Sequence, residues 1–256
     1  MQTWTDNAII LSYKTHGEHG AILSVLTEQY GRHNGYLYGA HSARKKALLD
    51  VGTITQLTWS AKAHDQLGHF QIEDGDNTAL DFLDDPLRLA GLLSVCALID
   101  QTLPERENHT GLYWGTRALF EQMVHDHIWG AAIVMWEISF LRELGFALDF
   151  SKCAGGGGVD DLIYMSPKSG CTVSREKGEI YKDKLLPLPN FLINREMTTD
   201  ISILDILKGI AMTGYFLEHW VFAQHTKGIP EQRLRFHRLL AQSCDTNFKG
   251  RVNHGS

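Results

Sequence analysis

Residues 53–59 read TITQLTW, and this stretch decides the fold of the first part of the chain. The apolar residues Ile54, Leu57 and Trp59 are interspersed with threonine and glutamine, which indicates a strand with one buried face. Further runs with strand character occupy residues 8–14, 21–26, 31–38 and 69–73. Turn-forming stretches separate them, such as HGEHG at 16–20 and DGD at 74–76. Five short strands in about 75 residues predict a small closed barrel, most commonly an OB-fold, because closure removes unpaired sheet edges.

From residue 78 onward the apolar residues follow a helical period. Their spacing predicts helices over 86–103, 109–127, 130–144, 200–224 and 230–242. Residues 151–190 interrupt this pattern with four consecutive glycines and with two strand-like runs at 162–165 and 171–174. The sequence therefore predicts an α+β multi-domain protein. We expect a barrel domain over 1–80, a mostly α-helical domain over 81–244 with the insertion 151–190, and a flexible tail over 245–256.

The composition is that of an ordinary globular chain, with 43% hydrophobic and 21% charged residues. The net charge of −6 is distributed unevenly: −2 over residues 1–80, −7 over 81–150 and +3 over 151–256. We therefore expect a polyanion to contact one or both ends of the chain rather than its middle. No apolar run approaches the roughly 18–20 residues that span a bilayer, and the start of the chain lacks the features of a secretory signal. These observations predict a cytoplasmic protein without membrane contact.

Two patterns raise the question of metal chemistry. The doublet His125–Asp126 is of the kind that some metal-dependent hydrolases place on a helix, although His127 points to a different helix face from His125. Cys153 and Cys171 flank the glycine run, but structural zinc usually needs two close pairs of ligands. The sequence also lacks a phosphate-binding loop and a nucleophile elbow. We therefore predict no catalytic residue, no metal and no cofactor, and we keep a hydrolase centred on the doublet as an alternative.

The barrel sequence combines basic and aromatic residues. Barrels that bind single-stranded nucleic acid use cations along the backbone and aromatic rings on which bases stack. We predict phosphate contacts from Arg32, Arg44, Lys45 and Lys46, and stacking of bases on Tyr36 or Tyr38; Trp59 and Phe70 occur on later strands. A second basic patch on the last helix comprises Arg233, Arg235 and Arg238. The alternatives are that the aromatic residues form the barrel core and that the cations belong to solvated surfaces.

Several stretches, in this order, resemble the RecO family of recombination mediators. They read AIILSYKTHGE at 8–18, LTEQYGR at 26–32, FLRELGF at 140–146, LIYMSPKSG at 162–170 and GYFLEH at 214–219. The resemblance implies an N-terminal OB-fold, a helical domain and often a four-cysteine zinc finger. In this sequence only Cys153 clearly keeps its place, and Cys171 matches at most one further position. We therefore expect a degenerate zinc-finger-like insertion that holds no metal.

The resemblance also implies a function, and it is not catalysis. Members of this family bind single- and double-stranded DNA and anneal complementary strands coated with single-stranded DNA-binding protein (SSB). They bind the C-terminal tail of SSB, and they work with RecR to load RecA, which places them at the nucleoid. An alternative is an adaptor whose OB-fold binds protein and does not anneal DNA.

Overall fold

The computed structural model describes residues 2–46, 48–63, 66–125, 128–194 and 201–252. The chain divides into two compact units. The first comprises Met1–Val124 and Pro230–Arg233, and the second comprises His125–Ile229 and Leu234–Ser256. Within the described ranges, every helix is too short or too polar to cross a lipid bilayer.

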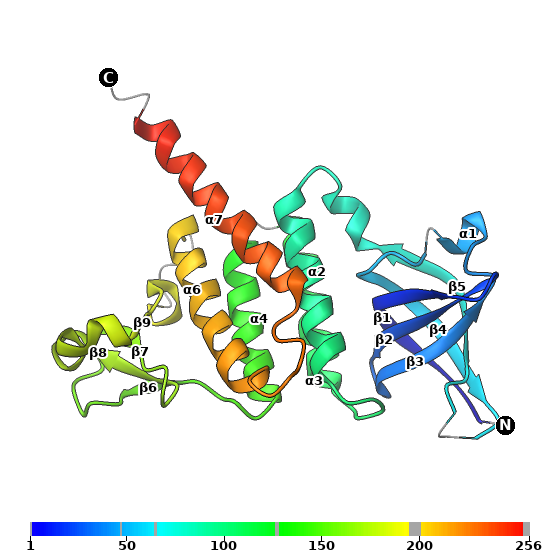
Figure 1. Cartoon of the computed structure of the whole chain (residues 1–256), viewed down its shortest axis with the longest axis horizontal. Helices are drawn as coiled ribbons and strands as arrows, with labels where there is room; N and C mark the ends of the chain where they lie inside the picture. Colours follow the sequence, from blue (N-terminus) through cyan, green and yellow to red (C-terminus); the bar gives the residue numbers. More distant parts are fainter. Residues whose placement is uncertain (1, 47, 64–65, 126–127, 195–200, 253–256) are drawn as a thin grey trace. The chain divides into compact units, whose positions relative to one another are not determined.

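The first unit begins with five strands that close into a barrel in the order β1-β2-β3-β5-β4 (Figure 1). They are β1 (Gln2–His16), β2 (Gly20–Thr27), β3 (Gly31–Tyr38), β4 (Thr53–Ala61) and β5 (His69–Asn77), with the short helix α1 (Ala43–Lys46) between β3 and β4. The long strand β1 pairs with β4 through its first half and with β2 through its second half. The predicted five-stranded OB-fold barrel is confirmed.

Two strands are longer than the sequence predicted. Strand β1 begins at Gln2 rather than at residue 8, because its first half is polar except for Trp4 and so carries a weak apolar signal. Strand β5 continues through the DGD stretch at 74–76, which we had predicted to be a turn. These residues instead pair with the start of β4. Residues 74–76 have the composition of a turn, but cross-strand hydrogen bonds hold them in a strand.

Alternate strand residues fill the barrel interior, as the period of two requires. The core contains Ala8, Ile10, Ala21, Leu23, Val25, Leu37, Ala40, Leu49, Leu57, Trp59, Ala61, Phe70 and Ile72. On β2 and β3 the residues between these core positions, such as Ile22 and Tyr36, therefore face outward.

Three helical segments follow the barrel: η1 (Thr78–Phe82), α2 (Pro86–Thr102) and α3 (Thr110–His125). The Asp85 side chain caps α2 by accepting a hydrogen bond from the Arg88 N–H at 3.0 Å, and Pro86 occupies the first turn. Helix α2 packs against β1 and β2, and Ser24 Oγ donates to Asp100 at 2.5 Å. Because of these contacts, the compact first unit extends past residue 80, where we had predicted the domain boundary.

The second unit contains three long helices. They are α4 (Trp129–Glu143), α6 (Ile203–Phe216), which continues as the π-helical turn η4 (Leu217–Val221), and α7 (Glu231–Val252). Ser202 caps α6 by accepting from the Asp205 N–H, so this helix starts later than predicted. Helix α7 runs to Val252, so it includes part of the stretch 245–256 that we predicted to be a flexible tail, and the tail stays a prediction. The chain contains no proline after Pro230 that would end the helix earlier.

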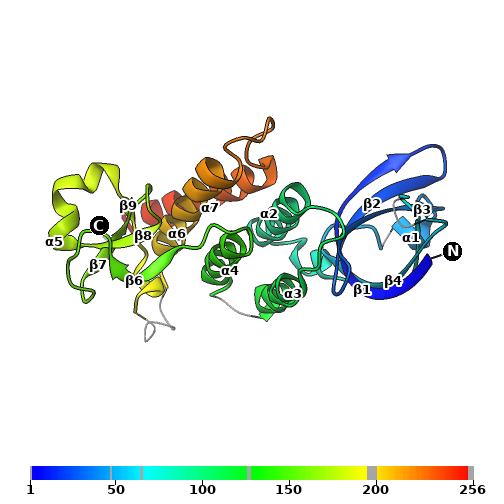
Figure 2. The same cartoon turned by 90° about the horizontal axis from the view of Figure 1, so that it is seen from below.

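The insertion forms a small four-stranded sheet in the order β6-β8-β7-β9 (Figure 2). Its elements are β6 (Asp149–Cys153), β7 (Leu162–Met165), β8 (Cys171–Ser174), α5 (Arg175–Gly178), η2 (Glu179–Lys184), β9 (Leu186–Pro187) and η3 (Asn190–Leu192). Strands β7 and β8 coincide with the two strands predicted from the sequence. The likeness of this sheet to a zinc finger stays a prediction.

Candidate nucleic-acid interface

The far ends of β1, β2 and β3 carry an aromatic and basic surface on the outside of the barrel. The strand register places Lys14, Ile22 and Tyr36 in one row, and His16, Gly20 and Tyr38 in the next. The Tyr36 ring lies directly over Gly20, where an added Cβ would meet the Tyr36 hydroxyl at 1.9 Å. We name this surface the tyrosine face and define it by Lys14, His16, Ile22, Tyr36, Tyr38 and Lys45.

The two tyrosines are placed to receive a base. Their ring centroids are 4.6 Å apart with the planes at 74°, so the edge of one ring supports the face of the other. Tyr38 is 64% exposed, and His16 and His69 flank the pair with ring centroids 6.0 Å from Tyr36 and Tyr38 respectively. An exposed ring that is held in place by its neighbours loses little conformational entropy when a base stacks on it.

A cation is fixed beside these rings. Lys45, on α1, donates from Nζ to the backbone carbonyl oxygen of Tyr38 at 2.7 Å. Lys46 is exposed on the same short helix. The structure therefore brings together the predicted residues Tyr36, Tyr38 and Lys45, with Lys46 following Lys45 on α1, while the Arg44 side chain lies outside the part of the structure that is described. Rings for stacking next to ammonium groups for phosphates are the elements of single-strand recognition.

Arg32 lies on the same strand but has other partners. Its Nε donates to the carbonyl oxygen of Leu103 at 2.7 Å, and its guanidinium lies 3.6 Å from Asp100 and 3.7 Å from Glu105. The Arg32 side chain is only 14% exposed. The predicted phosphate contact would require these interactions to break, so the placement of Arg32 favours a structural role in tying β3 to the segment after α2.

Other predicted aromatic and basic residues are also buried. Trp59 and Phe70 are 1% and 2% exposed and belong to the barrel core, as the alternative interpretation proposed. Arg233 is 1% exposed, so the predicted basic patch on α7 cannot include it. Arg235 and Arg238 are exposed. The helical period that put three arginines close together on α7 did not reveal which of them faces the protein interior.

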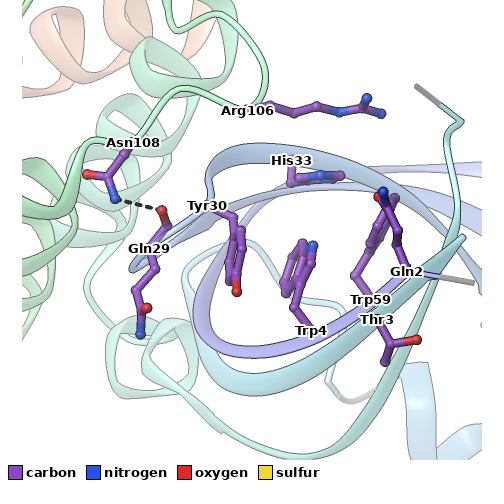
Figure 3. Close-up of a pocket in the computed structure, with 9 residues that line it drawn as sticks. All are labelled: Gln2, Thr3, Trp4, Gln29, Tyr30, His33, Trp59, Arg106 and Asn108. Carbon is purple, nitrogen blue, oxygen red and sulfur yellow. Dashed lines mark hydrogen bonds between the residues drawn. The ribbon is translucent and has the colours of Figure 1, made fainter. Parts of the chain in front are cut away.

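A second aromatic site, which the sequence analysis missed, lies at the start of β1 beside the β2–β3 turn (Figure 3). Trp4 stacks on Tyr30 with ring centroids 4.3 Å apart. Asp6 accepts hydrogen bonds from the N–H groups of Gln29 and Asn7 and so holds this turn in place. Burial raises the pKa of the Asp6 carboxyl group. The polar residues around Trp4 carry only a weak strand signal, and the pairing of Trp4 with Tyr30 depends on barrel closure and is invisible in the sequence.

The donor groups of the insertion do not fit the zinc ion that the family resemblance implies. Cys153 Sγ accepts from the Ser174 N–H at 3.2 Å, and the Ser174 hydroxyl lies 3.4 Å from the same sulfur. Gly156 and Ser174 stand where the second members of two C-x-x-C pairs would be. No group of three or more histidine, cysteine or acidic side chains is close enough to share a metal among the residues described. Of the His125–Asp126 doublet, Asp126 lies outside those residues.

The surroundings of Cys153 favour its thiolate. Burial raises the pKa of the thiol, but hydrogen bonds from Ser174 and from the N–H groups of Gly157 and Gly155 outweigh this and bring the pKa to about 7. The folded pKa lies below the ordinary thiol value. This group therefore stabilises the fold fully above that ordinary value, and the stabilisation is lost as the pH falls through about 7.

We expect Ser174→Ala to raise the pKa of Cys153, because it removes the hydroxyl that lies beside the sulfur. The measurement is the rate of alkylation of Cys153 against pH, followed by mass spectrometry of its peptide. The midpoint should move upward from about 7. Ser169→Ala, in the turn between β7 and β8, is the control and should leave the midpoint in place. An unchanged midpoint in Ser174→Ala would contradict the assignment.

Comparisons with known proteins agree over nearly the whole chain. The family described as "Recombination protein O N terminal" matches residues 1–74, and "Recombination protein O C terminal" matches residues 83–241. The chain is 43% identical over 235 residues to the DNA repair protein RecO of Rhodospirillum centenum, covering 91% of this chain and 92% of the relative. It is 40% identical over 240 residues to that of Caulobacter vibrioides, covering 94% and 98%. The chain therefore belongs to the RecO family of DNA repair proteins.

Proposed function

We propose that this protein binds single- and double-stranded DNA through the tyrosine face and anneals complementary strands coated with SSB. In this proposal it contacts the C-terminal tail of SSB and helps to load RecA together with RecR. It carries out no chemical step and needs no cofactor. Because all these partners are DNA or proteins on DNA, we place the activity at the nucleoid.

The observation that carries the proposal is the cluster of Tyr36, Tyr38 and Lys45 on one exposed surface of an OB-fold. Annealing requires that phosphates be neutralised while the base edges stay accessible for pairing. Rings that stack on the flat faces of bases leave the pairing edges uncovered, and lysines beside them reduce the repulsion between two strands. Family membership supports DNA as the ligand.

The first test is the annealing of complementary strands coated with SSB, from about 50 to 200 mM salt and without nucleotide. We expect acceleration that fades as the salt concentration rises and that persists with a chelator present. Binding to SSB without acceleration would favour the adaptor alternative. Loss of the acceleration with the chelator would contradict an insertion that holds no metal, and a metal analysis of the protein tests the hydrolase alternative.

Charge reversal of the basic helix tests the surface itself. We expect Arg44→Glu, Lys45→Glu and Lys46→Glu together to weaken single-strand binding by at least about tenfold and to reduce the slope of log K against log salt by about 2, since each phosphate contact contributes about 0.7. The control reverses the exposed residues Lys168, Lys184 and Lys227, which changes the net charge equally. Fluorescence anisotropy with a labelled strand measures both quantities. Equal losses of affinity in the two triple variants would show that net charge alone causes the effect, and would contradict the assignment of these phosphate contacts.

A further inference from the structure

The pocket beside the β2–β3 turn has the size and the lining of a ligand site. Its volume is about 510 Å³, within the range of about 300–1,000 Å³ that is usual for small-molecule sites. Aromatic rings line one side, and the amide side chains of Gln2 and Gln29 and the guanidinium of Arg106 complete the lining (Figure 3). The lining residues that the structure describes include one cation and no carboxylate.

The aromatic side is a stack of three nearly parallel rings. Trp4 lies between Tyr30, at 4.3 Å and 11°, and Trp59, at 5.6 Å and 19°. Figure 3 shows the three rings in a row, with His33 beside them. Trp59 is 1% exposed and closes the inner end of the stack, whereas Tyr30 is 40% exposed at the outer end. The stack therefore ends in an accessible ring whose position is fixed by the rings behind it.

Arg106 is held over this site by an unusual backbone. With φ of +67°, it is the one non-glycine residue in the described part of the chain with a left-handed conformation. Its N–H donates to the Arg32 carbonyl oxygen at 2.8 Å, and its Nη2 donates to the Gln66 carbonyl oxygen at 2.9 Å. Strained residues of this kind persist where the surrounding structure requires them, and they cluster at ligand sites. Here the strain directs a guanidinium across the pocket (Figure 3).

We propose that this pocket binds one unstacked nucleobase, with the phosphate of its nucleotide at Arg106. The proposal rests on the proposed function for the source of the base, which is single-stranded DNA. Base–aromatic stacking supplies affinity without regard to sequence, and a guanidinium is the side chain best suited to a phosphate. The pocket lies beside the start of β3, and the tyrosine face lies at its end.

The pocket predicts a difference between single and double strands. A base within a duplex is paired and stacked and must be extruded before it enters, which costs free energy that a single strand largely avoids. The lysines of the tyrosine face, in contrast, contact phosphates that both forms of DNA share, whereas its rings stack on unpaired bases. The pocket therefore adds affinity for single strands alone.

Tyr30→Ala removes the accessible ring and tests this difference. We expect its affinity for a 20-nucleotide oligothymidine to fall at least about fivefold, the lower end of what stacking on one ring contributes, with unchanged affinity for a 20-base-pair duplex. A strand with the same backbone but without bases should bind the wild-type protein and Tyr30→Ala with equal affinity. Tyr30→Phe should restore binding, and Tyr181→Ala, at an exposed tyrosine in the second unit, is the control. Retained duplex binding also shows that the variant is folded.

Arg106→Gly is the second variant, because glycine adopts a positive φ without strain. It should lower the salt slope of single-strand binding by about 0.7 and leave the salt slope of duplex binding unchanged. Thymidine monophosphate serves as a separate probe. If Tyr30→Ala abolishes the binding of thymidine monophosphate but leaves the binding of the single strand unchanged, the pocket binds free nucleotides and not a base of the strand. Equal losses for single strands and duplex, or no loss, would overturn the pocket proposal. A wild-type protein that binds neither DNA form would instead overturn the proposed function.

Discussion

Gly31→Ala will lower the free energy of unfolding by at least about 3 kcal/mol, the cost that severe strain or overpacking imposes on a closely packed backbone. Gly31 begins β3 with φ of +69°, a conformation that costs a residue with a Cβ about 1–2 kcal/mol. An alanine Cβ would also lie 1.6 Å from the carbonyl oxygen of Glu107, so the backbone itself must move. Urea denaturation followed by tryptophan fluorescence measures the change.

Gly17→Ala separates these two causes. Gly17 has nearly the same backbone angle, with φ of +66°, but no atom lies within 4 Å of the position of an added Cβ. Its substitution should therefore cost only about 1–2 kcal/mol, from the left-handed conformation alone. Equal losses in the two variants would show that the approach of the 104–108 segment to β3 contributes nothing to stability.

The same approach explains how the nucleobase pocket is built. Glycine at position 31 allows the backbone at Glu107 to come close to the β2–β3 turn, and Arg106 donates to Arg32 from the same segment. This segment lies beside the first half of β3, while β5 pairs with β3 at Tyr36 and Leu37. A barrel with a fully paired β3–β5 seam would leave less room for the pocket.

The regular parts of the fold were predictable because they depend on local patterns. Interspersed apolar and polar residues in 53–59 and in neighbouring runs identified the five barrel strands, and the insertion strands at 162–165 and 171–174 were predicted with the bounds that the structure gives them. The polar start of β1 and the acidic end of β5 were missed. Those segments are strands because of their partners across the sheet, and single-chain propensity does not report such partners.

The binding surfaces were predictable only in part, for a related reason. Tyr36, Tyr38 and Lys45 are close in sequence and lie on one strand and the helix after it, so their proximity could be inferred. Trp4, Tyr30 and Arg106 come from three distant segments, and only barrel closure and the approach of the segment after α2 bring them together. The same long-range contacts changed the interpretation of Arg32, whose partners Asp100 and Glu105 lie far along the chain.

Arg32→Ala gives the second large effect, a loss of about 2–3 kcal/mol in the free energy of unfolding. Charge-assisted hydrogen bonds contribute about 1.5–3 kcal/mol when they are shielded from water, and the Arg32 side chain is 14% exposed. Its removal leaves the Leu103 carbonyl oxygen without the guanidinium donor and Asp100 without its cation. Arg175→Ala is the matched control, because Arg175 pairs with Asp161 at 2.9 Å with both side chains more than half exposed, where such a pair contributes at most about 1 kcal/mol.

DNA binding decides between the two interpretations of Arg32. If its guanidinium holds β3 to the segment after α2, Arg32→Ala should bind single strands with an unchanged salt slope at a temperature where the variant is folded. A phosphate contact would give the opposite pattern: a slope lower by about 0.7 with little change in stability. The ion pairs with Asp100 and Glu105 make the first result the expected one, because a side chain held by two carboxylates and a carbonyl would have to give up favourable contacts to reach a phosphate.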